Sequence, residues 1–274
     1  MRSTVISPCL FAAFLCVGSI DAANAQLALP GAGDPTVAAL PDASAPAKPK
    51  AKPKPKAALE AKIDSVLGKT LKLNGTDGAM VIAKHGDALS VEKLTLKGES
   101  TADSGAPCTI DVRGDGPIAL KSMGKVEGLA HYSIDFPACP LEFDLLDKAT
   151  LVPQQSVACV FPAASCQANP GGLWGPGADE LQTSAKEIAA KRQKADAVLS
   201  ASLNALMKRD KGKNAAKISS DEESFASLRD DICKDYDGEA TLGFCGSRVT
   251  MARAVNLASQ LAPAKTKPKP VANQ

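Results

Sequence analysis

The sequence predicts an α+β protein of two domains, a small antiparallel β-sandwich or barrel followed by a disulfide-stapled helical bundle. Three observations lead to this prediction. Between residues 69 and 161, short segments that alternate apolar and polar residues are separated by glycine-containing turns. From residue 181 on, apolar residues recur at spacings of three, four or seven. Six of the eight cysteines follow residue 100, and an even number indicates disulfides.

The first 25 residues predict a secretory signal peptide. Arg2 precedes an apolar run over residues 5–20, and the Ala-Asn-Ala at 23–25 is a small-x-small cleavage site. The run is short for a membrane span and contains Pro8, which favours a signal peptide over a membrane anchor. We therefore expect a periplasmic or secreted protein, cleaved near Ala25, with no transmembrane segment in the mature chain.

Two segments rich in Ala, Pro and Lys, at 26–57 and 263–274, flank the rest of the chain. Their regular prolines exclude helix and sheet, so we expect a disordered tether and a similar tail. The two segments hold eight lysines, whereas residues 57–262 hold 23 basic and 27 acidic residues, a net charge of −4. Two interpretations stay open: solubilising linkers, or cationic arms that lie on anionic cell-wall polymer or lipid. Because the folded part is acidic and holds few aromatic residues, we expect no nucleic-acid partner.

Eight segments predict the strands of a β domain over residues 58–162. The short turns between them favour antiparallel pairing. His85 and His131 are predicted to be ordinary residues of the strand surface. The segments are 69–75, 79–86, 89–98, 108–114, 118–124, 130–136, 141–146 and 158–161. The residues expected to face the core are Leu71, Leu73, Val91, Leu94, Leu96, Ile110 and Val112.

Residues 163–180 are predicted to be a Pro/Gly-rich linker. The only tryptophan, Trp174, lies between two Pro-Gly turns. A lone tryptophan in such a loop typically pins the loop against a domain through its large apolar surface. Presentation of Trp174 to a partner is the alternative.

Residues 181–262 are predicted to form three helices. The segment 210–214 ends the first, and Ser219–Glu222 and Ser220–Glu223 each offer a capping box for the second. Pro263 ends the third. Since no helix can bury its apolar stripe alone, we expect the three to pack together. The stripes are Leu181, Ala185, Ile188, Ala195, Leu199, Leu203 and Leu206; Phe225, Leu228, Ile232 and Tyr236; and Val249, Ala254, Leu257, Ala258 and Leu261.

Six cysteines remain after removal of the predicted signal peptide, and they predict three disulfides. Six cysteines can be paired in fifteen ways. Proximity in the sequence favours Cys108–Cys139, Cys159–Cys166 and Cys233–Cys245. A structural argument supports only Cys233–Cys245, because an antiparallel helix pair brings the end of one helix close to the start of the next. No C-x-x-C occurs and neither histidine is near a cysteine pair, so we expect no metal, no redox pair and no cofactor.

One set of residues in the helical region follows a recognisable spacing. It comprises Asp196, Leu199, Arg229, Asp230, Cys233, Cys245, Thr250, Arg253 and Leu257. With these residues the region 181–262 resembles the helical domain of the LprI-like lysozyme-inhibitor family of bacterial envelope proteins. Ser200, Leu203 and Phe225 depart from the family, which has Asn, Tyr and Trp there. The resemblance implies a helical fold, a first cysteine pair at Cys159 and Cys166, and binding to a lysozyme-like muramidase.

The sequence lacks the common catalytic constellations. A serine or cysteine nucleophile needs a histidine base, and both histidines lie in predicted strands and turns. No phosphate-binding glycine loop occurs, and nothing singles out a pair of carboxylates for glycoside cleavage. We therefore expect a protein that is not an enzyme.

Acidic residues are concentrated in segment 221–239, which holds eight of them against two basic residues. Such a segment would attract a basic muramidase. The alternative is a solvated face that pairs with the nine basic residues between Lys186 and Lys217. A different function, a structural or interaction module held to the cell wall or lipid by the cationic arms, also stays open. The possible acidic binding face comprises Glu223, Asp230, Asp231, Asp235 and Asp237.

Overall fold

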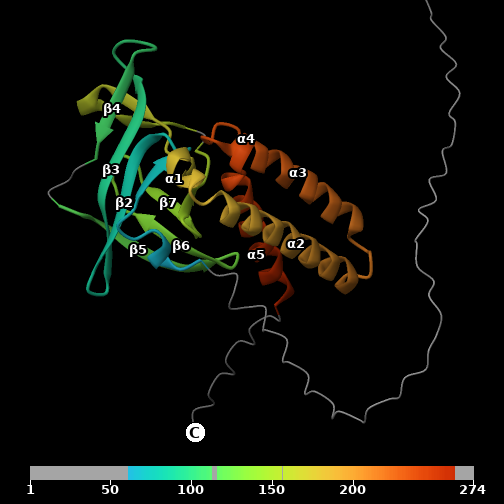
Figure 1. Cartoon of the computed structure of the whole chain (residues 1–274). Coiled ribbons are helices and arrows are strands. Elements are labelled where there is room, and N and C mark those ends of the chain that lie inside the picture. The colour runs from blue at the N-terminus through green and yellow to red at the C-terminus, as the bar shows by residue number, and fades with distance from the viewer. Residues whose placement is uncertain (1–60, 113–115, 156, 263–274) are drawn as a thin grey trace, which may run out of the picture. The chain divides into compact units, whose positions relative to one another are not determined.

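The computed structural model describes residues 61–112, 116–155 and 157–262. The predicted signal peptide, tether and tail lie outside these residues. The described chain is α+β, as predicted, with a large antiparallel sheet and several helices on one side of it (Figure 1). No helix within the described ranges is long and apolar enough to cross a membrane.

Eight strands form a closed antiparallel ring. They are β1 (Thr70–Leu73), β2 (Asp77–His85), β3 (Ala88–Ser100), β5 (Ile118–Val126), β6 (Leu129–Ile134), β7 (Leu141–Leu146), β8 (Ala149–Val152) and β11 (Gly172–Gly175). The order around the ring is β2-β1-β11-β8-β7-β6-β5-β3, and β3 pairs with β2 again. Closure provides hydrogen-bond partners for the backbone N–H and C=O groups that the edge strands of an open sheet would leave unpaired.

The inside of the ring is the first hydrophobic core. Side chains alternate across a strand, so every second residue points inward. Leu71, Leu94 and Phe143 are among its fully buried members. The core positions predicted from the alternation are all buried, apart from Leu73, which is half-buried.

Three short strands extend β3 beyond the ring, and two disulfides hold them. They are β4 (Pro107–Asp111), β9 (Cys159–Phe161) and β10 (Cys166–Ala168). Cys108 bonds to Cys166 and Cys139 bonds to Cys159, with Cα–Cα distances of 5.9 and 5.4 Å. The pairings favoured by proximity are therefore wrong for these four cysteines. Cys166 lies opposite Phe161 in the hairpin, and Cys159 opposite Ala168, so those two cysteines do not face each other.

The prediction that residues 163–180 form a linker is also wrong, because this segment contains β10 and β11. Strand β11 is one of the eight strands of the ring and pairs with β1 on one side and with β8 on the other. Trp174 belongs to the first core, and the adjacent Leu173 points to the opposite face of the sheet. Trp174 is buried, as expected, but it lies in a strand of the sheet and does not pin a loop: it is 0% exposed, and its Nε1 donates to the Pro170 carbonyl at 2.9 Å.

The helices are α1 (Ala178–Gln182), α2 (Ala185–Arg209), α3 (Ala215–Cys233), α4 (Glu239–Leu242) and α5 (Phe244–Leu261). The three long ones correspond to the predicted helices, with differences in α3. It begins four residues before Ser219 and has no side-chain cap, so the capping boxes are not formed. Tyr236 lies beyond its end, and Leu228 faces solvent instead of the stripe.

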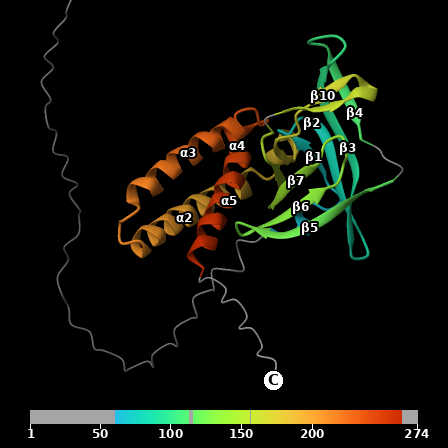
Figure 2. The same cartoon turned by 180° about the vertical axis from the view of Figure 1, so that it is seen from behind.

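A second hydrophobic core joins the helices to the outer face of the sheet. Leu146, Ala149 and Leu173 from β7, β8 and β11 pack with residues of every helix, among them Ile188, Ile232 and Val249. Both views show α2, α3 and α5 gathered on the same side of the sheet (Figures 1 and 2). The helical stripes therefore close on the sheet as well as on one another. The described residues between 61 and 262 all belong to a single compact unit, which differs from the predicted division into two domains.

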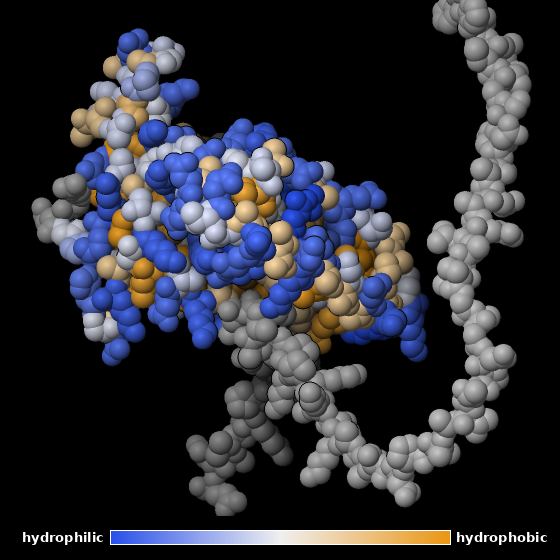
Figure 3. Space-filling model, viewed as in Figure 1, coloured by the Kyte–Doolittle hydropathy of each residue, from blue (hydrophilic) through white to orange (hydrophobic). Residues whose placement is uncertain are grey.

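The outer surface in the view of Figure 3 is mostly hydrophilic, with separate hydrophobic patches over both the sheet and the helices. Scattered apolar residues of this kind are normal on a folded surface.

An ion-pair chain connects α2 to the β7–β8 turn, and it predicts a pH dependence. Glu187 bonds to Lys148 at 3.2 Å and to Lys191 at 2.5 Å, and Lys191 also reaches Asp147. Lys191 first and Lys148 second lower the pKa of Glu187 to about 2. A carboxylate with a depressed folded-state pKa stabilises the fold above its unfolded pKa, near 4.5, and this contribution is lost as the pH falls toward 2.

We therefore expect Glu187→Gln to lower the free energy of unfolding by about 0.5–1 kcal/mol at pH 7, a small value because the pair is half-exposed. The difference from the wild type should vanish as the pH is lowered from 4.5 toward 2. Urea unfolding at pH 7, 4 and 3 measures it. The exposed Glu99→Gln serves as the control and should show no such trend. An equal difference at every pH would contradict the role given to the charge.

Candidate functional site

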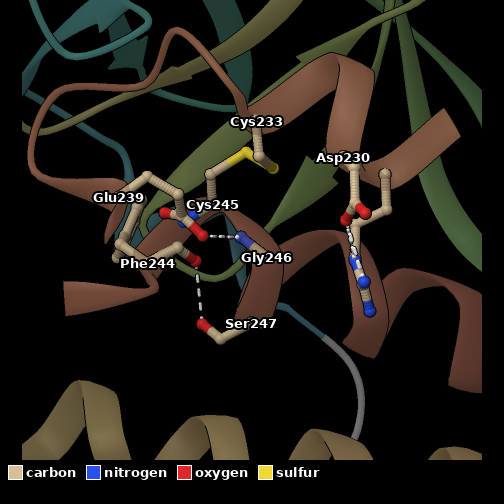
Figure 4. Close-up of a disulfide and its surroundings, with 8 residues drawn as sticks. Asp230, Cys233, Glu239, Phe244, Cys245, Gly246 and Ser247 are labelled. Carbon is tan, nitrogen blue, oxygen red and sulfur yellow. Dashed lines mark hydrogen bonds and ion pairs between the residues drawn. A yellow bond between two sulfur atoms is a disulfide. The ribbon is translucent and has the colours of Figure 1, made fainter. Parts of the chain in front are cut away.

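The disulfide between Cys233 and Cys245 joins α3 to α5, as the helix-pair argument predicts (Figure 4). The two Cα atoms are 5.5 Å apart and both cysteines are buried. Tyr236, in the connection, is buried against Phe244 and donates to the Pro176 carbonyl at 2.7 Å. The connection is thus held to the end of β11 as well as to the two helices.

Glu239 caps the start of α5 beside this disulfide. Its two carboxylate oxygens accept the backbone N–H groups of Cys245 and Gly246, each at 2.8 Å (Figure 4). Burial raises the pKa of Glu239, and the two backbone hydrogen bonds oppose that shift. Gly243 precedes α5 with φ of +65°, and a Cβ there would lie 2.7 Å from Arg192. The left-handed backbone conformation therefore favours glycine at this position, and a larger residue would also displace the end of the Arg192 side chain.

A groove of about 390 Å³ lies next to the disulfide, and we call it the staple groove. It collects residues from α2, α3, α4 and α5: Arg192, Asp196, Arg229, Asp230, Cys233, Lys234, Glu239, Ala240, Gly246 and Thr250. Four predicted family-motif residues, Asp196, Arg229, Asp230 and Thr250, are thereby brought together around Cys233. Its walls carry three basic and three acidic groups, which suits polar recognition more than the binding of an apolar ligand.

The other motif residues have structural positions. Arg253 bonds to Glu222 at 2.6 Å and its guanidinium lies 5.5 Å from the centre of the Phe225 ring. This contact fixes α3 against α5. Leu257 is buried and Leu199 is half-buried, so both serve packing.

The predicted acidic face is present in part. Asp230 pairs with Arg229 at 2.8 Å, and Asp231 lies 3.5 Å from Lys234. Glu223 and Asp235 are exposed and make no ion pair within the described chain. Asp237 does not belong to the face, because its side chain accepts the backbone N–H of Ala178 and its own N–H donates to Asn74. The expected pairing with residues 186–217 is represented by Lys217–Asp221, at 2.7 Å.

Leu228 is the feature of this face that sequence reasoning assigned to the core. It is 52% exposed, although leucine is among the residues most often buried. Asp221, Ser224 and Asp231 share its side of α3 at spacings of three, four and seven. An exposed leucine among carboxylates is thus displayed on the helix. We use "acidic face" below for Asp221, Leu228 and Asp231 of α3 together with Asp235, which follows the end of the helix; Glu223 and Asp230 lie on the other side of α3.

The two histidines are ordinary strand residues by position, but His131 is more constrained than the sequence suggests. His85 is exposed and pairs with Glu92. His131 lies between Asp144 and Glu142 of β7, at 2.8 and 3.3 Å. Burial lowers the pKa of His131, but the two carboxylates outweigh burial and raise it. Across the described ranges, no group of three His, Cys, Asp or Glu residues is placed to hold a metal ion.

No family model matches the chain, and neither a curated protein nor a solved structure matches it. The resemblance to the LprI-like family therefore stays a prediction. The fold and site define an α+β protein with a closed antiparallel sheet, three disulfides and a stapled helical face.

Proposed function

We propose that the protein is a non-catalytic recognition protein of the cell envelope, whose acidic face binds a basic protein, namely a lysozyme-like muramidase. The observation that carries the proposal is the exposure of Leu228 between carboxylates on α3. Interfaces commonly combine a desolvated apolar anchor with charges that orient the partner.

The arrangement of charge supports a basic partner. Asp235 has no ion pair to break within the described chain. The adjacent staple groove carries three acidic and three basic groups, so it offers polar contacts of both signs beside the face. Opposite charges on two proteins raise the association rate, and salt screens the effect.

The rigid frame of the face supports recognition without turnover. The disulfide and the Arg253–Glu222 pair hold α3 to α5, and the Glu239 cap holds α4 to the start of α5. A preformed surface loses less conformational entropy on binding. Three disulfides are typical of proteins in an oxidising compartment, which agrees with the predicted export.

The prediction is that the mature full chain, from residue 26, slows lysozyme in a cell-wall clearing assay, and more strongly at low salt than at high salt. The variant Asp231→Lys/Asp235→Lys should reduce the inhibition at least tenfold, because it reverses two charges of the face. The variant Asp87→Lys/Glu99→Lys makes the same change in net charge at exposed positions of the β2–β3 turn and of β3, and it should inhibit as the wild type does. Absence of slowing at low salt with excess protein would remove the muramidase as the partner.

A second function rests on the charge of the segments outside the described residues. Eight lysines there contrast with the acidic folded part, and they would hold the protein on anionic wall polymer or lipid. Sedimentation with isolated peptidoglycan should then be lost when residues 26–56 and 264–274 are deleted. Retained sedimentation would show that the arms are not the means of attachment.

A further inference from the structure

A larger groove lies between the sheet, α2 and α5, and no residue of α3 lines it. Its volume is about 480 Å³, within the range of small-molecule sites. The short helix η2 (Ile63–Ser65), strands β6 and β7, and the β7–β8 turn complete its walls. We call it the Arg248 groove, after the charged residue in its wall.

Arg248 is a buried cation with incomplete partners. Its side chain is only 5% exposed, and its guanidinium lies 4.5 Å from the centre of the Phe244 ring. One terminal nitrogen donates to Ser247 Oγ at 3.3 Å, and the other lies 3.5 Å from Asp147. Its Nε–H has no partner within the described chain. Since Asp147 makes its shorter contact, 2.6 Å, with Lys191, the charge of Arg248 is weakly compensated.

A charge buried without a full set of hydrogen bonds is costly to the fold. Burial does lower the pKa of Arg248, whereas Asp147 and Glu187 raise it. A guanidinium nevertheless stays protonated in proteins. An anion that enters the groove would supply the missing acceptor, and arginine binds such oxygens through two parallel hydrogen bonds.

The walls of the groove are of two kinds. Lys62, Lys191 and Lys194 add to the positive charge of Arg248, against two acids, Asp64 and Asp147. The remaining wall is largely apolar and comprises Ala61, Leu129, Leu145, Leu146, Met251, Ala252 and Val255. Positive charge and apolar surface in one groove match a ligand with an anionic head and an apolar chain.

We propose that the Arg248 groove binds an anionic acyl amphiphile, with the anionic head at Arg248 and the acyl chain along Met251 and Val255. Residues 48–56 carry five lysines and precede the groove residues Ala61 and Lys62 in the sequence, and positive charge attracts anionic lipid. The proposal is independent of the acidic face.

The test uses the full mature chain and dodecanoate, at concentrations below micelle formation, in competition with a fluorescent acyl carboxylate. Dodecanoate should bind saturably at one site per chain. Dodecyl phosphate distinguishes a phosphate-headed lipid source from a free carboxylate, and tight binding by either head supports the proposal. Dodecyltrimethylammonium has the same chain and the opposite charge, so it should bind at least tenfold more weakly. Equal binding of this cation would overturn the proposal.

Two methionine variants form a matched pair. Met251→Trp fills the groove and should weaken dodecanoate binding at least tenfold, whereas Met207→Trp, exposed on α2, should leave it within twofold of the wild type. If circular dichroism shows a native fold for Arg248→Met, this variant should bind dodecanoate no more tightly than dodecyltrimethylammonium. If the variant does not fold, the comparison of the two methionine variants tests the site by itself. Unchanged binding by Met251→Trp would overturn the site. Asp231→Lys/Asp235→Lys should bind dodecanoate normally, so failure of the muramidase proposal and failure of this one are separable.

Discussion

Replacing Trp174 with alanine is expected to lower the free energy of unfolding by about 4 kcal/mol. The indole is fully buried in the first core, and its N–H is satisfied by the Pro170 carbonyl. Gly78 lies beside the ring, and a Cβ there would lie 3.3 Å from the indole and would clash with the Thr95 carbonyl oxygen. Alanine would leave a cavity in the middle of a closed sheet, where the neighbouring strands cannot collapse without breaking their pairing.

The effect of Trp174→Ala should extend to the helices. Strand β11 places Trp174 in one core and Leu173 in the other, so loosening the strand disturbs both. Guanidinium unfolding followed by far-UV and near-UV circular dichroism should show one coincident transition, shifted to lower denaturant. Val160→Ala, at an exposed position, should change the free energy of unfolding by less than about 0.5 kcal/mol. Two separate transitions would instead support the two-domain organisation that the sequence predicts.

Replacing both cysteines of a disulfide with alanine is expected to have the other large effect on the free energy of unfolding. Cys108–Cys166 closes a separation of 58 residues and should contribute about 4 kcal/mol, whereas Cys233–Cys245 closes 12 and should contribute about 3 kcal/mol. The difference arises because a longer loop restricts the unfolded chain more. Thermal and denaturant unfolding of the two double variants, without reductant, measures both values.

The same two variants separate stability from recognition. Loss of Cys233–Cys245 frees the junction of α3 and α5, so binding through the acidic face should weaken beyond what the unfolded fraction explains. Loss of Cys108–Cys166 leaves that junction intact, and the folded fraction should bind normally. If both variants lose binding equally under conditions where each is folded, the staple does not position the face.

The local sequence pattern was sufficient to predict those structural features that depend on residues close together in the chain. The alternation in segments such as 89–98 predicts strands, because a strand with one buried face requires a period of two. The Cys233–Cys245 pair could be predicted because a short connection between antiparallel helices leaves few other geometries. The burial of Arg248 had one local signal: it shares a helical stripe with Phe244, Ala252 and Val255.

Other features depend on residues distant in the chain, and no local pattern contains them. The Gly-Leu-Trp-Gly of β11 has weak strand propensity, and it is a strand because β1 and β8 pair with it from both sides. Cys166 bonds to Cys108 because both β10 and β4 pair with β3.

By itself, the sequence determined the strands other than β8, β10 and β11, the long helices, the mixed α+β class and the helical staple, because each arises from interactions within a few turns or one hairpin. Only the tertiary structure decided the closure of the sheet, two of the disulfides, the exposure of Leu228 and the burial of Arg248. The physical reason is that burial is a property of what lies opposite a residue. In this chain the opposite surface of a helix is supplied by a sheet formed from residues far earlier in the sequence.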